Sequence, residues 1–343
     1  MRAALLREPF VIELVDLPDP VAGPGQVVVR VEATSICGSD LLGYRGVNPR
    51  TKPPTVPGHE LAGIVVSTGD GVDRALDGQR VVVEPNVSCR TCEWCRQGLP
   101  NVCATYSVLG ESLAVGGGLA EYVSVDADQV YPLPDGTPAA EGAIIQPLSI
   151  SYHGVVDRGQ VRNGETALIL GAGPIGLAAL LISRDIGART IVTDIVDDRL
   201  DAATRLGADR VIRADREDVA VAVRAATEGR GADVTFEAVG GAQQTSLADA
   251  VRATATRGRI VILGTFAKAP QPFPGYEFKN REITLLGSHG HPLTFAPTID
   301  LVAQGRLRPA DLITHRLPLA ESKRAFDLLD TRADGVIKVI LEP

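Results

Sequence analysis

The sequence lacks long apolar runs, blocks of like charge, internal repeats and low-complexity segments. No stretch approaches the ~20 apolar residues that a membrane-spanning helix needs, so we expect no membrane partner. Charges of both signs are interspersed, and the formal net charge is −8 with a pI of about 5.3. Since binding to phosphate requires a basic surface, this balance argues against a nucleic-acid partner.

The N-terminus also lacks the pattern of an export signal. An apolar run starts near Met1 but stops at Arg7-Glu8-Pro9, before a hydrophobic region of sufficient length can form. We therefore predict a first β-strand here and a cytoplasmic protein whose cysteines remain reduced.

The chain has 343 residues, of which 45% are hydrophobic, and this length favours two domains. The first third is rich in β-branched residues and turn signals, with short strands predicted at 27–31 and 80–83. After residue 150 the pattern becomes an alternation of strands and helices. Strands are predicted at 167–170, 190–193, 211–212, 234–236 and 260–263, and helices at 174–186 and 198–206. Such alternation is typical of an α/β fold with a doubly wound parallel sheet.

The alternation stops after Ser288. A helix at 319–329 and a strand at 336–340 follow, and we expect them to return to the first domain. The predicted domains are therefore 1–149 together with 289–343, and an inserted domain at 150–288.

The segment Gly171-Ala172-Gly173-Pro174-Ile175-Gly176 fits the dinucleotide-binding pattern G-x-G-x-x-G, between a predicted strand and a predicted helix. Its glycines allow a tight turn, close approach to a pyrophosphate and close packing of the helix. Asp194 ends the next strand, where a carboxylate binds ribose hydroxyls and repels a 2′-phosphate, which favours NAD over NADP. Arg199 lies close by in the sequence and leaves use of both cofactors open.

Four of the five cysteines, Cys89, Cys92, Cys95 and Cys103, fall within one short segment. In a reducing compartment this spacing indicates a closed, structural zinc site in a lobe at about 86–104, with two disulfides as the alternative. Cys37, His59 and Glu60 offer a thiolate, an imidazole and a carboxylate. These three groups can bind zinc and leave a position open, as a catalytic zinc requires.

These motifs, in this order, resemble the zinc-containing medium-chain dehydrogenase/reductases, in the branch similar to polyol and sorbitol dehydrogenases. The resemblance spans the whole chain. It rests on Cys37-Gly38-Ser39-Asp40, Gly58-His59-Glu60-x-x-Gly63, Gly78-Gln79-Arg80-Val81, the four-cysteine segment, Gln146-Pro147-Leu148, the glycine motif and Lys338-Val339-Ile340. It implies a GroES-like, mostly β catalytic domain with an inserted Rossmann domain.

The resemblance also implies roles for individual residues. Cys37 and His59 match ligands of a catalytic zinc, and Glu60 matches a ligand or a carboxylate next to it. Ser39 matches the hydroxyl that takes the proton of the substrate, and Asp40 the group that orients the histidine. Gln146 stands where this branch often has a zinc-facing glutamate. A further departure is Leu42, which replaces a histidine that passes the proton to solvent.

The remaining site predictions are less specific. The cofactor-binding set is completed by Leu263, Gly264, Ser288 and Lys338. Tyr44, Glu111 and His289 are predicted to contact the substrate, and His289 with His291 lies in a loop expected near the nicotinamide. Two exposed histidines with no role are the alternative.

The sequence thus predicts a zinc-dependent dehydrogenase that transfers a hydride from a polar secondary alcohol, such as a polyol, sugar or cyclitol, to NAD. It would hold one catalytic and one structural zinc. The alternatives are a dehydrogenase of the butanediol or threonine type, a zinc-free quinone or enone reductase, and a non-catalytic protein that binds zinc and NAD. Residues 282–286 are predicted to form an edge strand, which together with the resemblance suggests a dimer or homotetramer.

Overall fold

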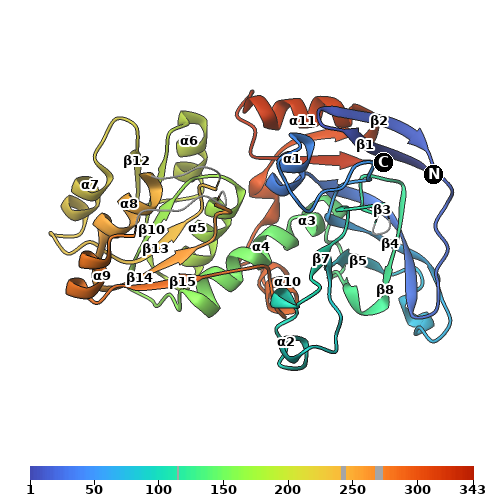
Figure 1. The fold of residues 1–343 in the computed structure, drawn as a ribbon, viewed down its shortest axis with the longest axis horizontal. Helices are drawn as coiled ribbons and strands as arrows, with labels where there is room; N and C mark the ends of the chain where they lie inside the picture. Colours follow the sequence, from blue (N-terminus) through green and yellow to red (C-terminus); the bar gives the residue numbers. More distant parts are fainter. Residues whose placement is uncertain (114–115, 241–244, 267–272) are drawn as a thin grey trace. The chain divides into compact units, whose positions relative to one another are not determined.

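The computed structural model describes residues 1–113, 116–240, 245–266 and 273–343. The chain divides into two units, which we call unit one (1–146 and 295–343) and unit two (147–294). Figure 1 labels helices and strands of both units. The sequence placed these boundaries at 149/150 and 288/289. The second boundary moves because the loop after residue 288 is tied to unit two, where Thr294 Oγ1 donates to the carbonyl of Ser149 at 3.1 Å.

Unit two is built on a six-stranded parallel sheet with the order β12-β11-β10-β13-β14-β15. Its elements are β10 (Thr166–Leu170), α5 (Pro174–Ile186), β11 (Arg189–Asp194), α6 (Asp197–Arg205), β12 (Arg210–Arg213), α7 (Val219–Ala226), β13 (Ala232–Glu237), α8 (Thr245–Ala253), β14 (Thr254–Ile262), α9 (Gly275–Arg281) and β15 (Thr284–Gly287). This order is that of a Rossmann fold, so the predicted α/β class is confirmed.

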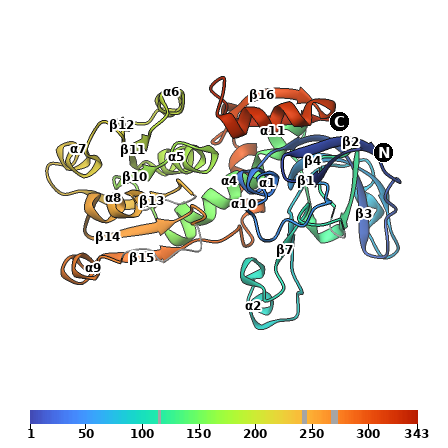
Figure 2. The ribbon, with the colours of Figure 1, turned by 45° about the horizontal axis from the view of Figure 1, so that its top comes forward.

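Every residue of β10 is buried, because helices cover both faces of the sheet (Figure 2). Leu168 and Leu170 pack in one cluster with side chains of α7 and α8. Alternate strand residues point to opposite faces, and Ile169 accordingly lies on the other face, beside Gly176 of α5. The continuous apolar run of this strand follows from its burial on both faces.

Unit one contains a mostly antiparallel sheet with the order β16-β17-β3-β4-β5-β9, to which β8 adds by pairing with β3. Its strands are β1 (Arg2–Glu8), β2 (Val11–Asp16), β3 (Gln26–Ser35), β4 (Glu60–Thr68), β5 (Arg80–Val83), β6 (Asn86–Val87), β7 (Ser107–Val108), β8 (Tyr122–Asp126), β9 (Val130–Pro132), β16 (Ile313–Pro318) and β17 (Lys338–Glu342). Its helices are α1 (Gly38–Tyr44), α2 (Glu93–Arg96), α3 (Ala139–Ala143), α10 (Phe295–Ala303) and α11 (Ser322–Thr331), and α4 (Ile145–Tyr152) crosses the boundary to unit two.

The two ends of the chain meet in the sheet of unit one, where β17 pairs antiparallel with β3. Leu341 lies opposite Thr34, and Ile340 lies opposite Ser35. The last strand therefore begins beside the segment that carries Cys37. Among the residues described, every helix is too short or too polar to cross a membrane.

Candidate active site and metal centres

The four clustered cysteines converge in a lobe of unit one formed by β6, α2 and β7 (Figure 1). Cys89 Sγ lies 4.0 Å from Cys95 Sγ, and Cys92 Sγ lies 4.0 Å from Cys103 Sγ. A tetrahedral zinc with Zn–S distances of ~2.3 Å would hold its sulfurs about 3.8 Å apart, whereas a disulfide requires ~2.05 Å. The spacing therefore fits a metal and not two disulfides.

Backbone N–H groups already point at these sulfurs. Cys92 N donates to Cys89 Sγ, and Cys89 N donates to Cys103 Sγ, each at 3.3 Å. Hydrogen bonds from the amides of Thr91 and Cys92 lower the pKa of Cys89 to about 5. Hydrogen bonds from Cys89 and Thr105 likewise lower the pKa of Cys103. Two of the four sulfurs are thus stabilised as thiolates, the form in which cysteine binds zinc, whereas burial raises the pKa of Cys95 to about 11.

A second cluster joins Cys37, His59 and Glu60, whose ligand atoms all lie within 4.8 Å of one another. Strand pairing explains how residues so far apart in sequence meet. In the β3–β4 pair, Ser35 lies opposite Glu60. Cys37, two residues beyond Ser35, caps the N-terminus of α1 and so faces the start of β4.

Asp40 fixes the imidazole of His59. Its Oδ1 lies 3.3 Å from His59 Nδ1, and its Oδ2 accepts from Cys37 N at 2.9 Å. Burial opposes charge on both groups, but their mutual attraction outweighs it, raising the pKa of His59 and lowering that of Asp40. Because Asp40 takes Nδ1, Nε2 remains for a metal, the arrangement usual for zinc-bound histidines.

Glu60 and Lys338 form a buried ion pair inside this cluster. Lys338 Nζ contacts Glu60 Oε2 and also donates to the carbonyl of Ile36 at 3.2 Å. The Lys338 side chain is 2% exposed. We predicted Lys338 as a cofactor contact from the sequence, but the structure places its ammonium against the metal cluster, because β17 pairs with β3.

Glu60 Oε1 is buried and has no hydrogen-bond partner among the residues described. An unsatisfied carboxylate oxygen in the interior is costly unless it is paired or coordinates a metal. Together with a thiolate and an imidazole, it completes a mixed donor set suited to zinc. The residues present therefore fit a zinc ion in this cluster.

Ser39 and Gln146 belong to the same unit. Ser39 lies half-buried in the first turn of α1, and its carbonyl accepts from Asn48 Nδ2 at 3.3 Å. Gln146 is buried at the start of α4. Leu42 is half-buried in α1.

The structure places Tyr44, a predicted substrate contact, in the core of unit one. Tyr44 is 1% exposed, its ring packs edge-on against Phe10 and at a tilt against Phe326, and its hydroxyl donates to Asp327 Oδ1 at 3.0 Å. It belongs to the core beneath α11. Two turns of helix α1 separate it from Cys37, which is why proximity in sequence was misleading.

Glu111 has partners that the sequence did not reveal. Its carboxylate accepts from Arg50 Nε at 2.6 Å, from the backbone N of Val108 at 3.1 Å and from Ser107 Oγ at 3.3 Å. Sequence reasoning missed Arg50 entirely, because an exposed arginine 61 residues away carries no local signal.

In unit two the glycine motif adopts the predicted geometry. Gly171 has φ +96°, a conformation that side chains disfavour. A Cβ on Gly176 would lie 1.8 Å from the carbonyl oxygen of Gly171, so only glycine lets α5 pack this closely. Pro174 occupies the first position of α5, Ile175 follows it, and Gly173 caps the helix. The free N–H groups of such a helix start bind phosphates.

Asp194 ends β11 beside this loop, where its carboxylate is 8% exposed. Asp194 Oδ2 accepts from Ala172 N at 2.8 Å, and Oδ1 accepts from Ile195 N at 2.7 Å. Arg199 NH1 lies 3.8 Å from the carboxylate. Both residues are therefore positioned at the phosphate loop of unit two.

The other cofactor predictions fall near the carboxyl ends of β14 and β15. The N–H groups of Leu263 and Gly264 both donate at 2.8 Å to the carbonyl of Glu237.

Ser288 follows β15, with His289 exposed and His291 buried. The alternative of two exposed histidines therefore fails for His291. Glu237 is a residue that the sequence analysis missed, a buried carboxylate whose pKa is raised by burial.

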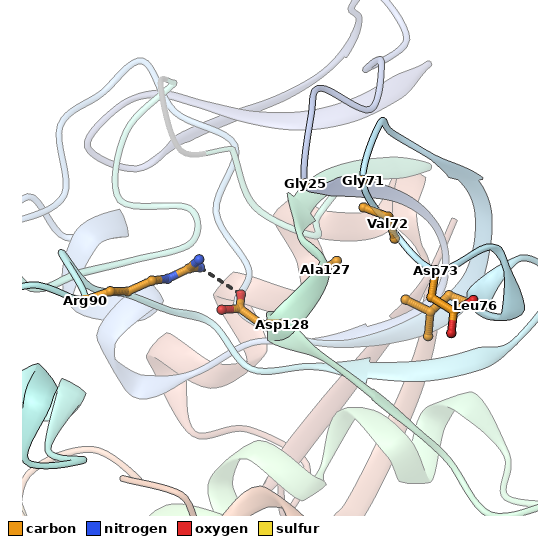
Figure 3. A pocket seen from close by; sticks show the side chains of 8 residues that line it. All are labelled: Gly25, Gly71, Val72, Asp73, Leu76, Arg90, Ala127 and Asp128. Carbon is orange, nitrogen blue, oxygen red and sulfur yellow. Dashed lines mark hydrogen bonds and ion pairs between the residues drawn. The ribbon is translucent and has the colours of Figure 1, made fainter.

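One open cavity of about 390 Å³ lies elsewhere in unit one (Figure 3). Its only arginine, Arg90, already binds Asp126 and Asp128, each at 2.7 Å. None of the candidate metal ligands lines it. We therefore do not assign it to the site.

Two family models match the chain. Residues 23–135 match the alcohol dehydrogenase GroES-like domain, and residues 174–304 match the zinc-binding dehydrogenase model. Sorbitol dehydrogenase from Bombyx mori is 34% identical over 99% of this chain and 97% of its own. L-Idonate 5-dehydrogenase from Vitis vinifera is 34% identical over 94% and 89%.

Solved structures agree with these matches. An alcohol dehydrogenase from Escherichia coli CFT073, complexed with NADH, has a TM-score of 0.92 at 31% identity and covers 100% of this chain and 99% of that one. A zinc-binding dehydrogenase from Sinorhizobium meliloti 1021, bound to NADP, has a TM-score of 0.91 at 31% identity with the same coverage. 2R,3R-Butanediol dehydrogenase from Bacillus subtilis has a TM-score of 0.91 at 28% identity, again with 100% and 99% coverage.

The fold and the two metal clusters define an oxidoreductase that works with a nicotinamide cofactor. The chain belongs to the zinc-containing medium-chain dehydrogenase/reductase family, in its polyol dehydrogenase-like branch.

Proposed function

We propose that this enzyme transfers a hydride from a polar secondary alcohol of the polyol, sugar or cyclitol class to NAD. The observation that carries this proposal is the buried cluster of Cys37, His59 and Glu60, with its unsatisfied carboxylate oxygen. Zinc in this cluster supplies a Lewis acid that favours loss of the alcohol proton.

The residues around the cluster have separate tasks in this proposal. Ser39 accepts the hydroxyl proton of the substrate. Asp40 holds the imidazole of His59 in one orientation, and Lys338 balances the charge of Glu60. Gln146, in place of a glutamate, offers an amide carbonyl as a neutral fourth donor. The chain otherwise positions the carbinol for hydride transfer, whose chemistry belongs to the cofactor.

NAD is the proposed cofactor because Asp194 presents a carboxylate beside the phosphate loop, where a 2′-phosphate would be repelled. Arg199 offsets part of this repulsion at 3.8 Å. Steady-state kinetics with both cofactors test the preference. We expect Asp194→Gly to lower kcat/KM for NAD and to raise it for NADP, and unchanged ratios would contradict the assignment.

The function itself is tested by formation of reduced cofactor. Zinc-loaded protein is assayed against hexitols, pentitols, cyclitols, sugars and simple secondary alcohols, with NAD and NADP in parallel. Turnover of a polyol or sugar by the metal-loaded protein, absent after chelation, is the expected result. Turnover confined to 2,3-butanediol would favour the alternative suggested by the butanediol dehydrogenase fold match. No turnover by protein that binds zinc and NAD would favour a non-catalytic role.

We also propose that β15 forms the contact with a second copy of the chain. This strand lies at the edge of the sheet in unit two, and its Leu285 is 42% exposed. An exposed apolar edge strand is usually paired or covered. Light scattering is expected to give the mass of a dimer or tetramer, and Leu285→Lys to lower it. A monomeric wild-type mass would reject this proposal.

The free thiols of the lobe are consistent with the cytoplasmic location that we predict.

A further inference from the structure

We propose that Arg50 is a specificity residue that directs this enzyme to alcohols carrying a carboxylate or phosphate group. This inference rests on the proposed function, which it narrows from polar alcohols in general to acidic polyols. It depends on where Arg50 lies, on how its guanidinium is held and on which of its donors remain open.

Arg50 lies on a segment that packs along helix α1. Its backbone N donates to Asn48 Oδ1 at 3.1 Å, and Asn48 Nδ2 donates to the carbonyl of Ser39 at 3.3 Å. Farther along α1, a Cβ on Gly43 would lie 2.6 Å from Thr51 Oγ1, so the two segments touch. The segment is thereby tied to the helix whose N-terminus Cys37 caps.

Glu111, the partner of Arg50, follows a residue that packs against the loop before His59. Gly110, which precedes Glu111, packs against the loop before His59, since a Cβ on Gly110 would lie 3.0 Å from Pro57. The carbonyl of Gly110 also accepts from Thr55 Oγ1 at 3.0 Å. The Arg50–Glu111 pair is therefore anchored to both chain segments that supply the zinc ligands Cys37 and His59.

The guanidinium is held in one orientation. Its Nε donates to Glu111 Oε1 at 2.6 Å, and its central carbon lies 5.9 Å from the centre of the Tyr106 ring. Burial raises the pKa of Tyr106 to about 12, and charges on both Arg50 and Cys37 act on it. The ring of Tyr106 therefore packs beside the guanidinium of Arg50.

The two terminal amino groups of Arg50 make no hydrogen bond or ion pair to the residues that the structure describes. The side chain is 46% exposed, so these donors are accessible. A planar guanidinium held at Nε and open at its other edge matches the geometry of a carboxylate or phosphate, which it binds through two parallel charge-assisted hydrogen bonds. A neutral polyol offers no such acceptor pair.

The chain provides a matched control in Arg80. It too pairs through Nε with one glutamate, Glu32, at 3.0 Å, and its side chain is 42% exposed. Arg80 begins β5, where it lies opposite Ile64, and its side chain makes no hydrogen bond or ion pair to the metal cluster within the part of the chain that the structure describes. Arg50→Gln and Arg80→Gln therefore remove similar surface pairs in different places.

The experiment compares hexonates and hexitol phosphates with hexitols of the same stereochemistry. We expect wild-type kcat/KM to be at least tenfold higher for an acidic substrate than for its neutral match. Arg50→Gln is expected to lower kcat/KM for the acidic substrate by about 10- to 100-fold, corresponding to loss of a charged hydrogen-bond pair, with a much smaller effect on the hexitol. Arg80→Gln is expected to leave both values near wild type.

Preference for the neutral alcohol, or an equal loss on both substrates in Arg50→Gln, would overturn the proposal. Calorimetry of hexonate binding to the zinc-loaded protein tests the anion site at Arg50 independently of the proposed function. Binding that weakens tenfold or more in Arg50→Gln supports the anion site even if no polyol turns over. Binding of equal strength in both proteins contradicts the site whatever the turnover.

Discussion

The two candidate metal clusters of this protein share cysteine but differ in nearly every other respect. The lobe gathers four thiols from a segment of fifteen residues, Cys89 to Cys103. Three of these four cysteines are only partly buried. The second cluster draws one thiol, one imidazole and one carboxylate from β-strand ends and buries two of the three groups. Four thiolates leave zinc no open position, whereas three mixed donors do.

The groups around the two clusters also differ in charge. Backbone N–H groups are the main partners of the lobe sulfurs. Charged side chains surround the other cluster, with Asp40 on His59 and Lys338 on Glu60. Buried charges are expensive to assemble and mark sites of chemistry more often than sites of folding. The comparison teaches that ligand type and the charge around it distinguish a catalytic metal from a structural one.

The largest expected effect is the loss of catalysis when the mixed cluster is broken. For His59→Gln we expect kcat/KM to fall by about 10³-fold or more, since Lewis-acid stabilisation is worth several kcal/mol. Metal analysis is expected to find the lobe zinc still present. Activity near wild type in this variant would remove the distinction between the clusters.

Breaking the four-cysteine site is expected to lower stability and to leave catalysis nearly unchanged. Cys95→Ser breaks the four-thiolate site, so we expect loss of its zinc and a melting temperature lower by about 5 °C or more, because a structural zinc contributes folding free energy. The activity of the chains that remain folded should change only a few-fold. Glu93→Gln, a neighbour in α2 that is not a ligand, serves as the control. A loss of turnover without loss of stability would contradict a structural role.

The buried pair of Glu60 and Lys338 offers a test that depends on the metal. Lys338→Met leaves a buried carboxylate without its counter-charge, which typically costs about 3–5 kcal/mol. Bound zinc supplies a replacement positive charge, so we expect the loss of stability in urea to be large with a chelator and small with zinc. The exposed Lys323→Met is the control, since its pair with Asp327 is worth ~0.5 kcal/mol. An equal loss of stability with and without zinc would contradict the assignment of a metal next to Glu60.

The smallest effect is expected at Tyr44, which lies near Cys37 in sequence but not in function. Tyr44→Phe removes the hydrogen bond to Asp327 and is expected to cost about 1 kcal/mol of stability. KM and kcat should remain unchanged. A tenfold increase in KM would restore Tyr44 as a substrate contact.

Local patterns made much of this architecture predictable. The helix from Pro174 to Ile186 and the strand at 80–83 were placed at their observed bounds. The lobe ligands follow from spacing alone, and the glycine motif follows from its position between a strand and a helix. The sheet order in unit two agrees with the alternation of strands and helices.

Features that depend on strand register were not predictable from the residues. The pairing of Ser35 with Glu60 brings Cys37 to His59, and only the family resemblance anticipated it. The pairing of β17 with β3 places Lys338 against Glu60, a contact that the sequence did not predict. The contact between Arg50 and Glu111 joins two loops, where neither periodicity nor motif gives a signal.

The most direct test of this account is a zinc titration of the metal-free protein that follows turnover and melting temperature together, in wild type and in Cys37→Ser. We predict that Cys37→Ser retains one zinc and the stabilisation due to the lobe, and that it shows no turnover at any zinc concentration. Wild type should gain turnover only as the mixed cluster fills. Turnover by Cys37→Ser, or full activity of metal-free wild type, would contradict the assignment of the catalytic metal to Cys37, His59 and Glu60.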